Sequence, residues 1–354
     1  MGDARKKPNP ASSSSGETLI EGRRPLRCIV KLGGAAITRK NELESINEES
    51  LGSVCAQLRE AMASSSIGSA SPPPRGISMD WSRRSGDRIL PVSVDDFGEH
   101  SAVDFDNNFV IVHGAGSFGH FQASTSGVHK GGLHLPLVKA GFVATRISVT
   151  SLNLEIVRAL AREGIPSVGM SPFACGWSTQ KRNVASADAA QIIHSLSAGF
   201  VPVLHGDAVL DHLQGCTILS GDVIIRHLAQ LLMPKYVVFL TDVLGVYDRP
   251  PSDPNAILLR EIVVDEDGSW SVLKPTLEQL KKEVEITVAA HDTTGGMETK
   301  ISEAAVIARL GIDVYITKAG TEHSLIALKG QVDNDTEDWL GTVIRSSKHA
   351  PLSA

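Results

Sequence analysis

Cysteines and long apolar runs are both scarce in this chain of 354 residues, and each scarcity excludes a class of protein. The sequence contains only four cysteines, which lie far apart and form no C-x-x-C pair: Cys28, Cys55, Cys175 and Cys216. Neither a disulfide framework nor a zinc site is expected from them, and a reducing compartment fits. No apolar run approaches the roughly 20 residues of a membrane-spanning helix, and the first residues lack the apolar core of a secretory signal. We therefore expect a cytoplasmic protein with no membrane partner, although the Arg, Lys and Ser residues of the N-terminal segment leave organelle targeting open.

An excess of positive charge is also missing. The formal net charge is -6, which argues against a broad nucleic-acid-binding surface. Hydrophobic residues make up 42% of the chain and charged residues 21%, as expected for a globular protein with a large core. Positive charge for a phosphate ligand must therefore come from a few local side chains.

Two familiar signatures of phosphate-handling enzymes are absent as well. The chain has no G-x-x-x-x-G-K-[ST] loop, and it lacks the H-R-D catalytic loop of protein kinases. If this protein transfers phosphate, it must belong to another lineage.

A glycine-rich turn follows an apolar segment within residues 108–120. Gly114 and Gly116 let the backbone approach a ligand closely, and successive amides before a helix form an anion site. His120 adds a side-chain donor that titrates near neutral pH. The combination predicts a site for a phosphate ester, and the alternative is a tight turn without a ligand.

The same glycines also fit the dinucleotide fingerprint G-x-G-x-x-G, with Gly119 as the third glycine. That fingerprint needs an acidic residue about 20 residues further on to hold the ribose. No Asp or Glu occurs between positions 120 and 150, and the first is Glu155. The dinucleotide interpretation is therefore disfavoured.

Hydrophobic periodicity predicts short strands that alternate with helices. Besides the apolar segment before the glycine turn, the expected strands cover residues 26–32, 165–170, 200–204, 236–240 and 312–316. The expected helices cover residues 48–62, 136–163, 186–196 (with Ser186 as N-cap), 222–232 and 297–310. This alternation predicts an α/β fold, a three-layer αβα sandwich around a mainly parallel central sheet.

Composition divides the chain into one expected domain with flanking and inserted polar segments. Residues 1–25 and 346–354 are expected to be tails, the first of them disordered. Residues 26–345 form the expected single domain, and residues 64–106 are a low-complexity insertion, expected to be mostly disordered, whose role the sequence does not reveal.

Positively charged and glycine residues follow the first expected strand. Lys31 precedes Gly33 and Gly34, so an ammonium group stands beside exposed backbone amides, which suits phosphate oxygens. Lys40 lies nine residues further on and could project into the same crevice. For each lysine the alternative is an ordinary surface charge.

Three later segments add similar features. Gly221 and Asp222 precede a helix, where the carboxylate could orient a lysine or simply cap the helix. Asp242 follows the strand at 236–240, at the strand end where ligands of open α/β sheets lie; a turn is the alternative. Residues 294–300 place Gly296 at a helix start and Lys300 one turn into the helix.

Together these segments resemble the amino-acid kinase superfamily, and most closely the isopentenyl phosphate kinases. The resemblance runs in order over about residues 26–345 and rests on residues 31–40, 113–120, 220–222, 241–247 and 294–300. The G-S-F-G-H sequence that ends at His120 is the most specific mark, since branches that phosphorylate amino acids, carbamate or nucleotides are not expected to carry it.

The resemblance implies transfer of the γ-phosphoryl group of ATP to isopentenyl phosphate, and it leaves dimethylallyl phosphate open as a second acceptor. Mg²⁺ would bridge the ATP phosphates without a protein metal ligand, and the enzyme would be a homodimer. Two alternatives stay open: a kinase of the same superfamily with another acceptor, or a nucleotide-binding sensor without catalytic activity.

The resemblance also implies a role for individual residues. Lys31 would contact the transferred phosphoryl group, Lys40 would stabilise the transition state, and Asp222 would hold the lysines in place. His120, Ala115 and Gly221 would bind the acceptor phosphate. The residues implied to bind the nucleotide are Lys31, Leu32, Gly33, Gly34, Ala35, Gly116, Asp242, Gly296 and Lys300.

An isoprenoid tail needs an apolar pocket. Five apolar residues of the helix at 136–163 are candidates for its lining, with ordinary core packing as the alternative: Leu137, Val138, Phe142, Val143 and Ile147.

Overall fold

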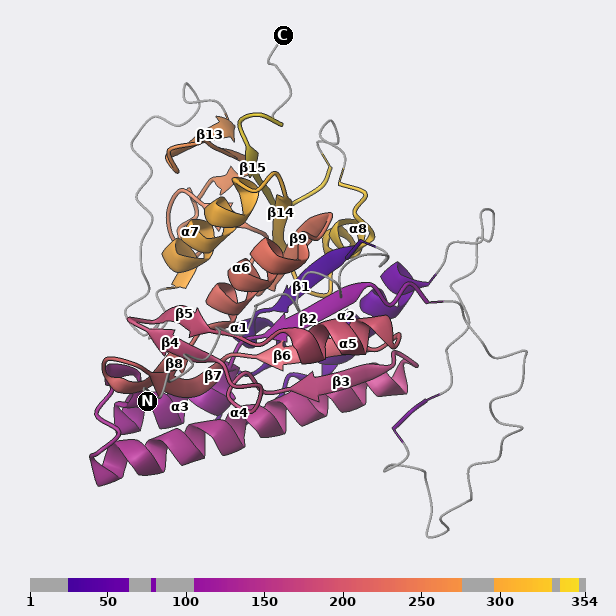
Figure 1. The fold of residues 1–354 in the computed structure, drawn as a ribbon. Helices are drawn as coiled ribbons and strands as arrows, with labels where there is room; N and C mark the ends of the chain where they lie inside the picture. Colours follow the sequence, from indigo (N-terminus) through magenta and orange to yellow (C-terminus); the bar gives the residue numbers. More distant parts are fainter. Residues whose placement is uncertain (1–24, 64–77, 81–104, 276–295, 333–337, 350–354) are drawn as a thin grey trace, which may run out of the picture.

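A nine-stranded, mostly parallel sheet forms the centre of the computed structural model, with helices on both of its faces (Figure 1). The structure describes residues 25–63, 78–80, 105–275, 296–332 and 338–349. The α/β sandwich expected from the sequence is thereby confirmed. The expected N-terminal tail and most of the expected insertion lie outside the described residues.

The strand order of the sheet is β13-β12-β15-β14-β9-β1-β2-β6-β3, and the six strands from β14 to β3 all run parallel. The strands span Cys28–Leu32 (β1), Phe109–His113 (β2), Ser167–Met170 (β3), Val201–His205 (β6), Tyr236–Thr241 (β9), Glu261–Val264 (β12), Trp270–Lys274 (β13), Asp313–Lys318 (β14) and Thr342–Ser346 (β15). Since β1 lies between β2 and β9, the carboxyl ends of strands from both halves of the sheet meet around it.

Two buried apolar clusters separate the sheet from its helices, one on each face. Helices α5, α6 and α7 pack on one face, and α1, α2, α3, α4 and α8 on the other. The helices span Gly34–Ile37 (α1), Glu48–Met62 (α2), Gly116–Ser126 (α3), Pro136–Arg162 (α4), Ala190–Ser197 (α5), Gly221–Leu232 (α6), Gly296–Ala308 (α7) and Glu322–Lys329 (α8). The longest described helix, α4, has 27 residues, and neither it nor another described helix has the apolar character that a membrane crossing needs.

The two-residue period of β1 decides which way its lysine points. Ile29 packs with the cluster beneath α6, whereas Val30 and Leu32 pack with the cluster on the opposite face. Because alternate side chains of a strand share a face, Lys31 points to the same side as Ile29, towards α6.

A second, four-stranded sheet of order β5-β4-β7-β8 stands beyond the carboxyl end of the main sheet. Its strands span Ser178–Gln180 (β4), Asn183–Ser186 (β5), Asp207–Asp211 (β7) and Gly215–Leu219 (β8), and a two-stranded ribbon joins Val246–Tyr247 (β10) to Leu258–Leu259 (β11). A third small cluster, which includes Val128, Phe142 and Cys216, packs this sheet against α3 and α4. The sequence patterns did not predict these short strands.

The predicted helix at residues 186–196 has the wrong start. Ser186 is the last residue of β5 and pairs with Ser178 of β4, so it does not cap a helix. Helix α5 begins at Ala190, where the Asp188 carboxylate accepts a hydrogen bond from the Ala190 amide at 2.8 Å. The other predicted helices and strands are confirmed, with ends that differ by a few residues at most.

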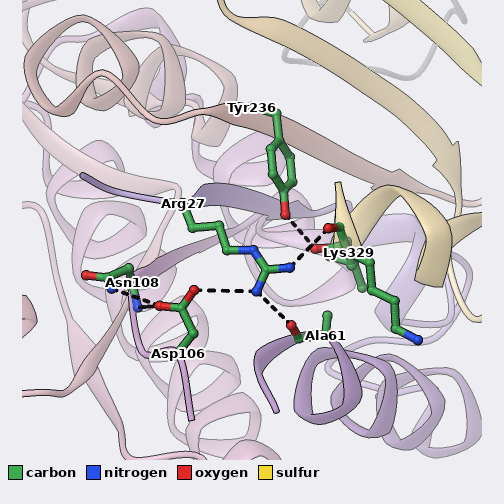
Figure 2. A network of polar contacts seen from close by, with 7 residues as sticks. Arg27, Ala61, Asp106, Asn108, Tyr236 and Lys329 are labelled. Carbon is green, nitrogen blue, oxygen red and sulfur yellow. Dashed lines mark hydrogen bonds and ion pairs between the residues drawn. The ribbon is translucent and has the colours of Figure 1, made fainter. Parts of the chain in front are cut away.

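Arg27 ties the amino end of the sheet to two helix ends (Figure 2). Its guanidinium donates to the carbonyl oxygen of Ala61 at 3.0 Å and to that of Lys329 at 3.0 Å, and it contacts the Asp106 carboxylate at 3.4 Å. The same group lies 5.3 Å from the ring centroid of Phe109. One cation therefore satisfies carbonyl groups near the C-termini of α2 and α8, where the helix dipole favours positive charge.

Substitution Arg27→Met removes these donors while it keeps an unbranched stem. We expect the free energy of unfolding to fall by about 2 kcal/mol, because charge-assisted hydrogen bonds contribute roughly 1.5–3 kcal/mol. Chemical denaturation followed by circular dichroism measures the change. Arg27→Lys, which keeps the charge but cannot reach all three acceptors, should fall between wild type and Arg27→Met; a wild-type value for Arg27→Met would contradict the assignment.

Candidate active site

A cavity of about 900 Å³ opens at the carboxyl ends of β9, β1 and β2, and residues just after β6 complete this side of it. Its lining combines the loops after these strands with the starts of α3 and α6. The predicted site residues that line it are Lys31, Gly33, Gly34, Ala35, Lys40, Ala115, Gly116, His120, Gly221, Asp222, Asp242 and Lys300. One predicted residue does not, since the Leu32 side chain is fully buried in the core, and Gly296 is placed only as the first residue of α7.

Asp222 lies between two lysines at the floor of the cavity. Ser220 caps α6 by accepting a hydrogen bond from the Val223 amide, so the Asp222 carboxylate serves the lysines instead of the helix end. Lys31 donates a hydrogen bond to Asp222, and the Lys300 ammonium nitrogen lies 3.6 Å from the same carboxylate oxygen. The three side chains come from β1, α6 and α7, and each is largely buried.

Burial and charge shift the pKa values of this group in opposite directions. Burial lowers the pKa of Lys31 to about 8; the Asp222 carboxylate counteracts this effect, and the nearby Lys300 charge adds to it. Burial alone would raise the pKa of Asp222, but the charges of Lys300 and Lys31 outweigh it and lower that pKa. The corner therefore holds two cations against one carboxylate and has a surplus of positive charge for an anion.

The sequence patterns did not predict that the ammonium groups of both lysines contact one aromatic ring. The Phe239 ring, in the middle of β9, lies 5.9 Å from the Lys31 ammonium nitrogen and 5.5 Å from that of Lys300, measured to the ring centroid. Ammonium groups at this distance from an aromatic face are attracted by its quadrupole. Only the register of β9 beside β1 shows this relation, because the apolar run at 236–240 does not distinguish Phe239 from its neighbours.

Glycine backbones continue the parallel ladder beyond the strand ends. The amide of Gly33 donates to Leu240, that of Gly114 to Leu32 and that of Gly206 to His113, at 2.8, 2.9 and 3.0 Å. Gly206 was not among the predicted site residues. These bonds bring the loops after four adjacent strands into one surface.

Two of these loops touch so closely that a side chain would not fit between them. A Cβ atom at Gly34 would overlap the backbone nitrogen of Gly116, and Gly116 itself has a φ of +52°. Only glycine meets both requirements without strain.

Lys40 and Asp242 pair at the mouth of the cavity. Their charged atoms lie 2.7 Å apart, and both side chains are well exposed. Lys40 belongs to a loop between Thr38 and Ile46, which form an isolated bridge. An exposed pair of this kind is weak, so either partner can exchange it for a ligand at little cost.

The three carboxylates that line the cavity among the described residues all have cationic partners. Asp222 serves the two lysines and Asp242 pairs with Lys40. Asp207 accepts hydrogen bonds from Arg146 at 3.2 Å and from Ser171 at 2.8 Å. Within the described part of the chain, no group of three or more His, Cys, Asp or Glu residues could hold a metal ion.

One end of the cavity is lined by α3, α4 and the small sheet. His120 lines it from the second turn of α3, a helix of 11 residues that begins at Gly116. None of the five apolar α4 residues named as candidates lines the cavity: Val138 and Phe142 pack into the small cluster, as the alternative of core packing predicts, whereas Leu137, Val143 and Ile147 are exposed. The largely apolar part of this end is formed instead by Phe121, Ala123, Thr145, Val149, Ile218 and Leu219.

Fold and cavity together are those of an α/β protein whose site brings lysine side chains and glycine backbones to the strand ends, a combination that suits phosphate groups. The amino acid kinase family matches residues 82–318. The chain is 68% identical to isopentenyl phosphate kinase of Arabidopsis thaliana over 328 residues, which cover 92% of this chain and 97% of that protein. It is 34% identical to isopentenyl phosphate kinase of Methanothermobacter thermautotrophicus over 301 residues, 82% of this chain and 90% of the relative.

A solved structure supports the same relation. One isopentenyl phosphate kinase known from X-ray structures superposes with a TM-score of 0.63 at 28% identity, over 90% of this chain and 99% of the other. The chain belongs to the amino acid kinase family, within the group of the isopentenyl phosphate kinases.

Proposed function

We propose that this protein is an isopentenyl phosphate kinase, which transfers the γ-phosphoryl group of ATP to isopentenyl phosphate and releases isopentenyl diphosphate and ADP. The observation that carries the proposal is the meeting, in one cavity, of a buried lysine pair and a glycine turn that ends in His120. The first supplies charge for a transferred phosphoryl group, and the second supplies donors for an acceptor that already bears a phosphate. The identity of 68% with the Arabidopsis thaliana enzyme supports the same acceptor.

The reaction needs positioning and charge stabilisation more than proton transfer. An acceptor monophosphate has a second pKa of about 6 and is a nucleophile near neutral pH without a general base. The cavity fits this requirement, since Asp207, Asp222 and Asp242, the carboxylates that line it in the described part of the chain, are each engaged by cations. As the γ-phosphoryl group moves in line between two oxygens, Lys31 and Lys300 balance the negative charge, and Asp222 keeps their ammonium groups in place.

Lys40 is the mobile cation of the proposal. Its ammonium group pairs with Asp242 at the mouth of the cavity, on a loop held at its base by the bridge between Thr38 and Ile46. Nucleotide phosphates offer more negative charge than one exposed carboxylate, so Lys40 exchanges Asp242 for the transferred phosphoryl group when ATP binds. Asp242 is then free to contact the nucleotide. The N-terminal region of α7 around Gly296 contacts the nucleotide as well.

The acceptor binds with its phosphate at the start of α3 and its tail towards the small sheet. His120 and the amides of Ala115 and Gly221 contact the phosphate, where the helix N-terminus favours an anion. Val149 and Ile218 flank a short apolar tail. Both isopentenyl and dimethylallyl groups have five carbons, so this end can admit either.

The proposal extends to the metal, the assembly and the compartment. Mg²⁺ takes its ligands mainly from ATP phosphates and water, which fits a cavity with few carboxylates, and it supplies charge neutralisation on the phosphates when bound. A homodimer follows from the resemblance, and α4 exposes apolar side chains at Val143, Ile147 and Leu154 that a second subunit can cover. The four free thiols fit the cytoplasm.

A panel of acceptors tests the proposed function. Release of ADP from Mg-ATP should occur with isopentenyl phosphate and dimethylallyl phosphate, and not with N-acetylglutamate, aspartate, carbamate or UMP. The reason is that His120 and the α3 amides recognise a phosphate, and the adjoining apolar end accepts a short tail. Turnover confined to an amino acid or UMP would keep the fold but overturn the acceptor.

Substitution His120→Ala removes a charge-assisted bond to the acceptor phosphate, which contributes about 1.5–3 kcal/mol. We expect kcat/KM for isopentenyl phosphate to fall roughly 10- to 150-fold, while the KM for ATP stays within twofold of wild type. Steady-state kinetics with each substrate varied in turn measure both values. His134→Ala, at an exposed histidine nearby in sequence, is the matched control and should behave as wild type. An unchanged kcat/KM in His120→Ala would remove His120 from the acceptor site.

The pKa of Lys31 predicts a pH dependence. Because burial lowers this pKa to about 8, Lys31 loses its proton in the free enzyme as the pH rises through that value. We expect kcat/KM for ATP to decline above about pH 8, and kcat to decline only at higher pH because bound phosphates stabilise the ammonium group. Lys31→Arg should lower kcat but lose this alkaline decline, since arginine keeps its charge. The same decline in Lys31→Arg would mean that another group causes it.

A further inference from the structure

We propose that His113 is a positioning residue for the acceptor site: its buried imidazole holds the Gly114 carbonyl so that the Ala115 amide faces the acceptor phosphate. His205, on the neighbouring strand, holds Gly206 in the same way. This inference rests on the proposed function, and it concerns two histidines to which the mechanism above gives no part.

The two histidines occupy equivalent places on adjacent parallel strands. His113 ends β2 and His205 ends β6, and they are direct partners in the register of the two strands. Their rings lie 5.6 Å apart at 33°, and both side chains are almost completely buried. Neither residue lines the cavity, so neither touches a substrate.

Each ring contacts the carbonyl of the glycine that follows it. The Nδ1 atom of His113 lies 2.9 Å from the Gly114 carbonyl oxygen, and that of His205 lies 3.0 Å from the Gly206 carbonyl oxygen. In a planar trans peptide the carbonyl and the next amide point in opposite directions. A Gly114 carbonyl turned towards the ring therefore directs the Ala115 amide away from it, to the cavity that Ala115 lines.

The partners of His113 decide where its proton lies. The Asn153 side-chain nitrogen contacts His113 Nε2 at 3.1 Å and also donates to the Val203 carbonyl at 3.0 Å. An amide nitrogen can only donate, so Nε2 accepts and the single proton of a neutral ring lies on Nδ1. That proton is the one that the Gly114 carbonyl receives.

The surroundings keep the ring neutral. Burial, and after it the neighbouring His205, lower the pKa of His113 to about 3. The charged groups nearest to the pair on the β6 side are Asp207 and Arg146, which form an ion pair with each other. At neutral pH the ring is thus a fixed donor, and it does not act as an acid or a base.

The backbone of His113 links its imidazole to the cluster formed by Lys31, Asp222 and Lys300. Its carbonyl accepts the Gly206 amide at 3.0 Å. A Cβ atom placed on Gly221 would lie 3.4 Å from the same carbonyl oxygen and 3.3 Å from the Lys31 side chain. A shift at the end of β2 would therefore displace the backbones of Gly114, Gly206 and Gly221, which all line the cavity.

Two substitutions distinguish the effect of the Nδ1–H donor from the effect of the volume of the imidazole ring. His113→Leu has similar volume and no donor, whereas His113→Asn places an amide N–H near the position of Nδ1. We expect His113→Leu to raise the KM for isopentenyl phosphate at least tenfold with the KM for ATP within twofold of wild type, and His113→Asn to recover most of this loss. Val201→Ala, a buried change at the far end of β6, should lower the melting temperature and leave both KM values unchanged.

Equal KM values for His113→Leu and wild type, or equal impairment of His113→Asn and His113→Leu, would overturn the proposal. Because His113→Leu is a buried change that can prevent folding, ¹⁵N spectra of histidine-labelled wild-type enzyme provide a second measurement, with His113→Asn to assign the signal. The expected signal is a neutral ring protonated on Nδ1 at pH 7.5, and an Nε2-protonated or charged ring would contradict the inference. Failure of the wild-type enzyme to phosphorylate isopentenyl phosphate would instead overturn the proposed function.

Discussion

Two ammonium groups can share one buried corner of this protein only because a single carboxylate lies between them. Without Asp222, Lys31 and Lys300 would repel each other in a largely buried corner, and burial would favour their neutral forms. Asp222 lies in the first turn of α6. Because Ser220 caps this helix, the Asp222 carboxylate is available to the two lysines. The surrounding features follow from this group: the ring of Phe239 beneath it, the glycine loops around it and the opening of the cavity above it.

Much of the architecture could be predicted from periodicity alone. Helix α2 and strands such as β9 carry clear apolar patterns, and the rule that parallel strands present ligands at their carboxyl ends predicts where the site lies. The glycine-rich segments were recognisable because glycine is needed where backbones approach closely, as Gly34 and Gly116 do. Local secondary structure and the ligand-binding residues at the strand ends could therefore be predicted from the sequence.

The features that could not be predicted from the sequence depend on contacts between segments that are distant in the chain. The partnership of His113 with His205 arises from the register of β2 beside β6; His113 begins the 113–120 segment, but His205 stands in no motif, so the sequence does not show the pair. The apolar residues of α4 near its start do not share one face: Val138 and Phe142 are buried, whereas Val143 and Ile147 are exposed, and the sequence does not show which side of the helix meets the cavity. The short, polar strands of the small sheet, such as β5 with Ser186 at its end, lack the alternation that identifies longer strands.

The position of β1 in the centre of the sheet has an evolutionary consequence. Everything proposed to contact the acceptor, from Ala115 to Gly221, comes from one continuous stretch of chain, and Asp242 and Lys300 belong to the stretch that follows it. Mutations that reshape the first stretch leave the second intact. A lineage built on this plan can therefore acquire a new acceptor by drift in one half of its sequence while the other half, under constant selection for the same nucleotide, changes little.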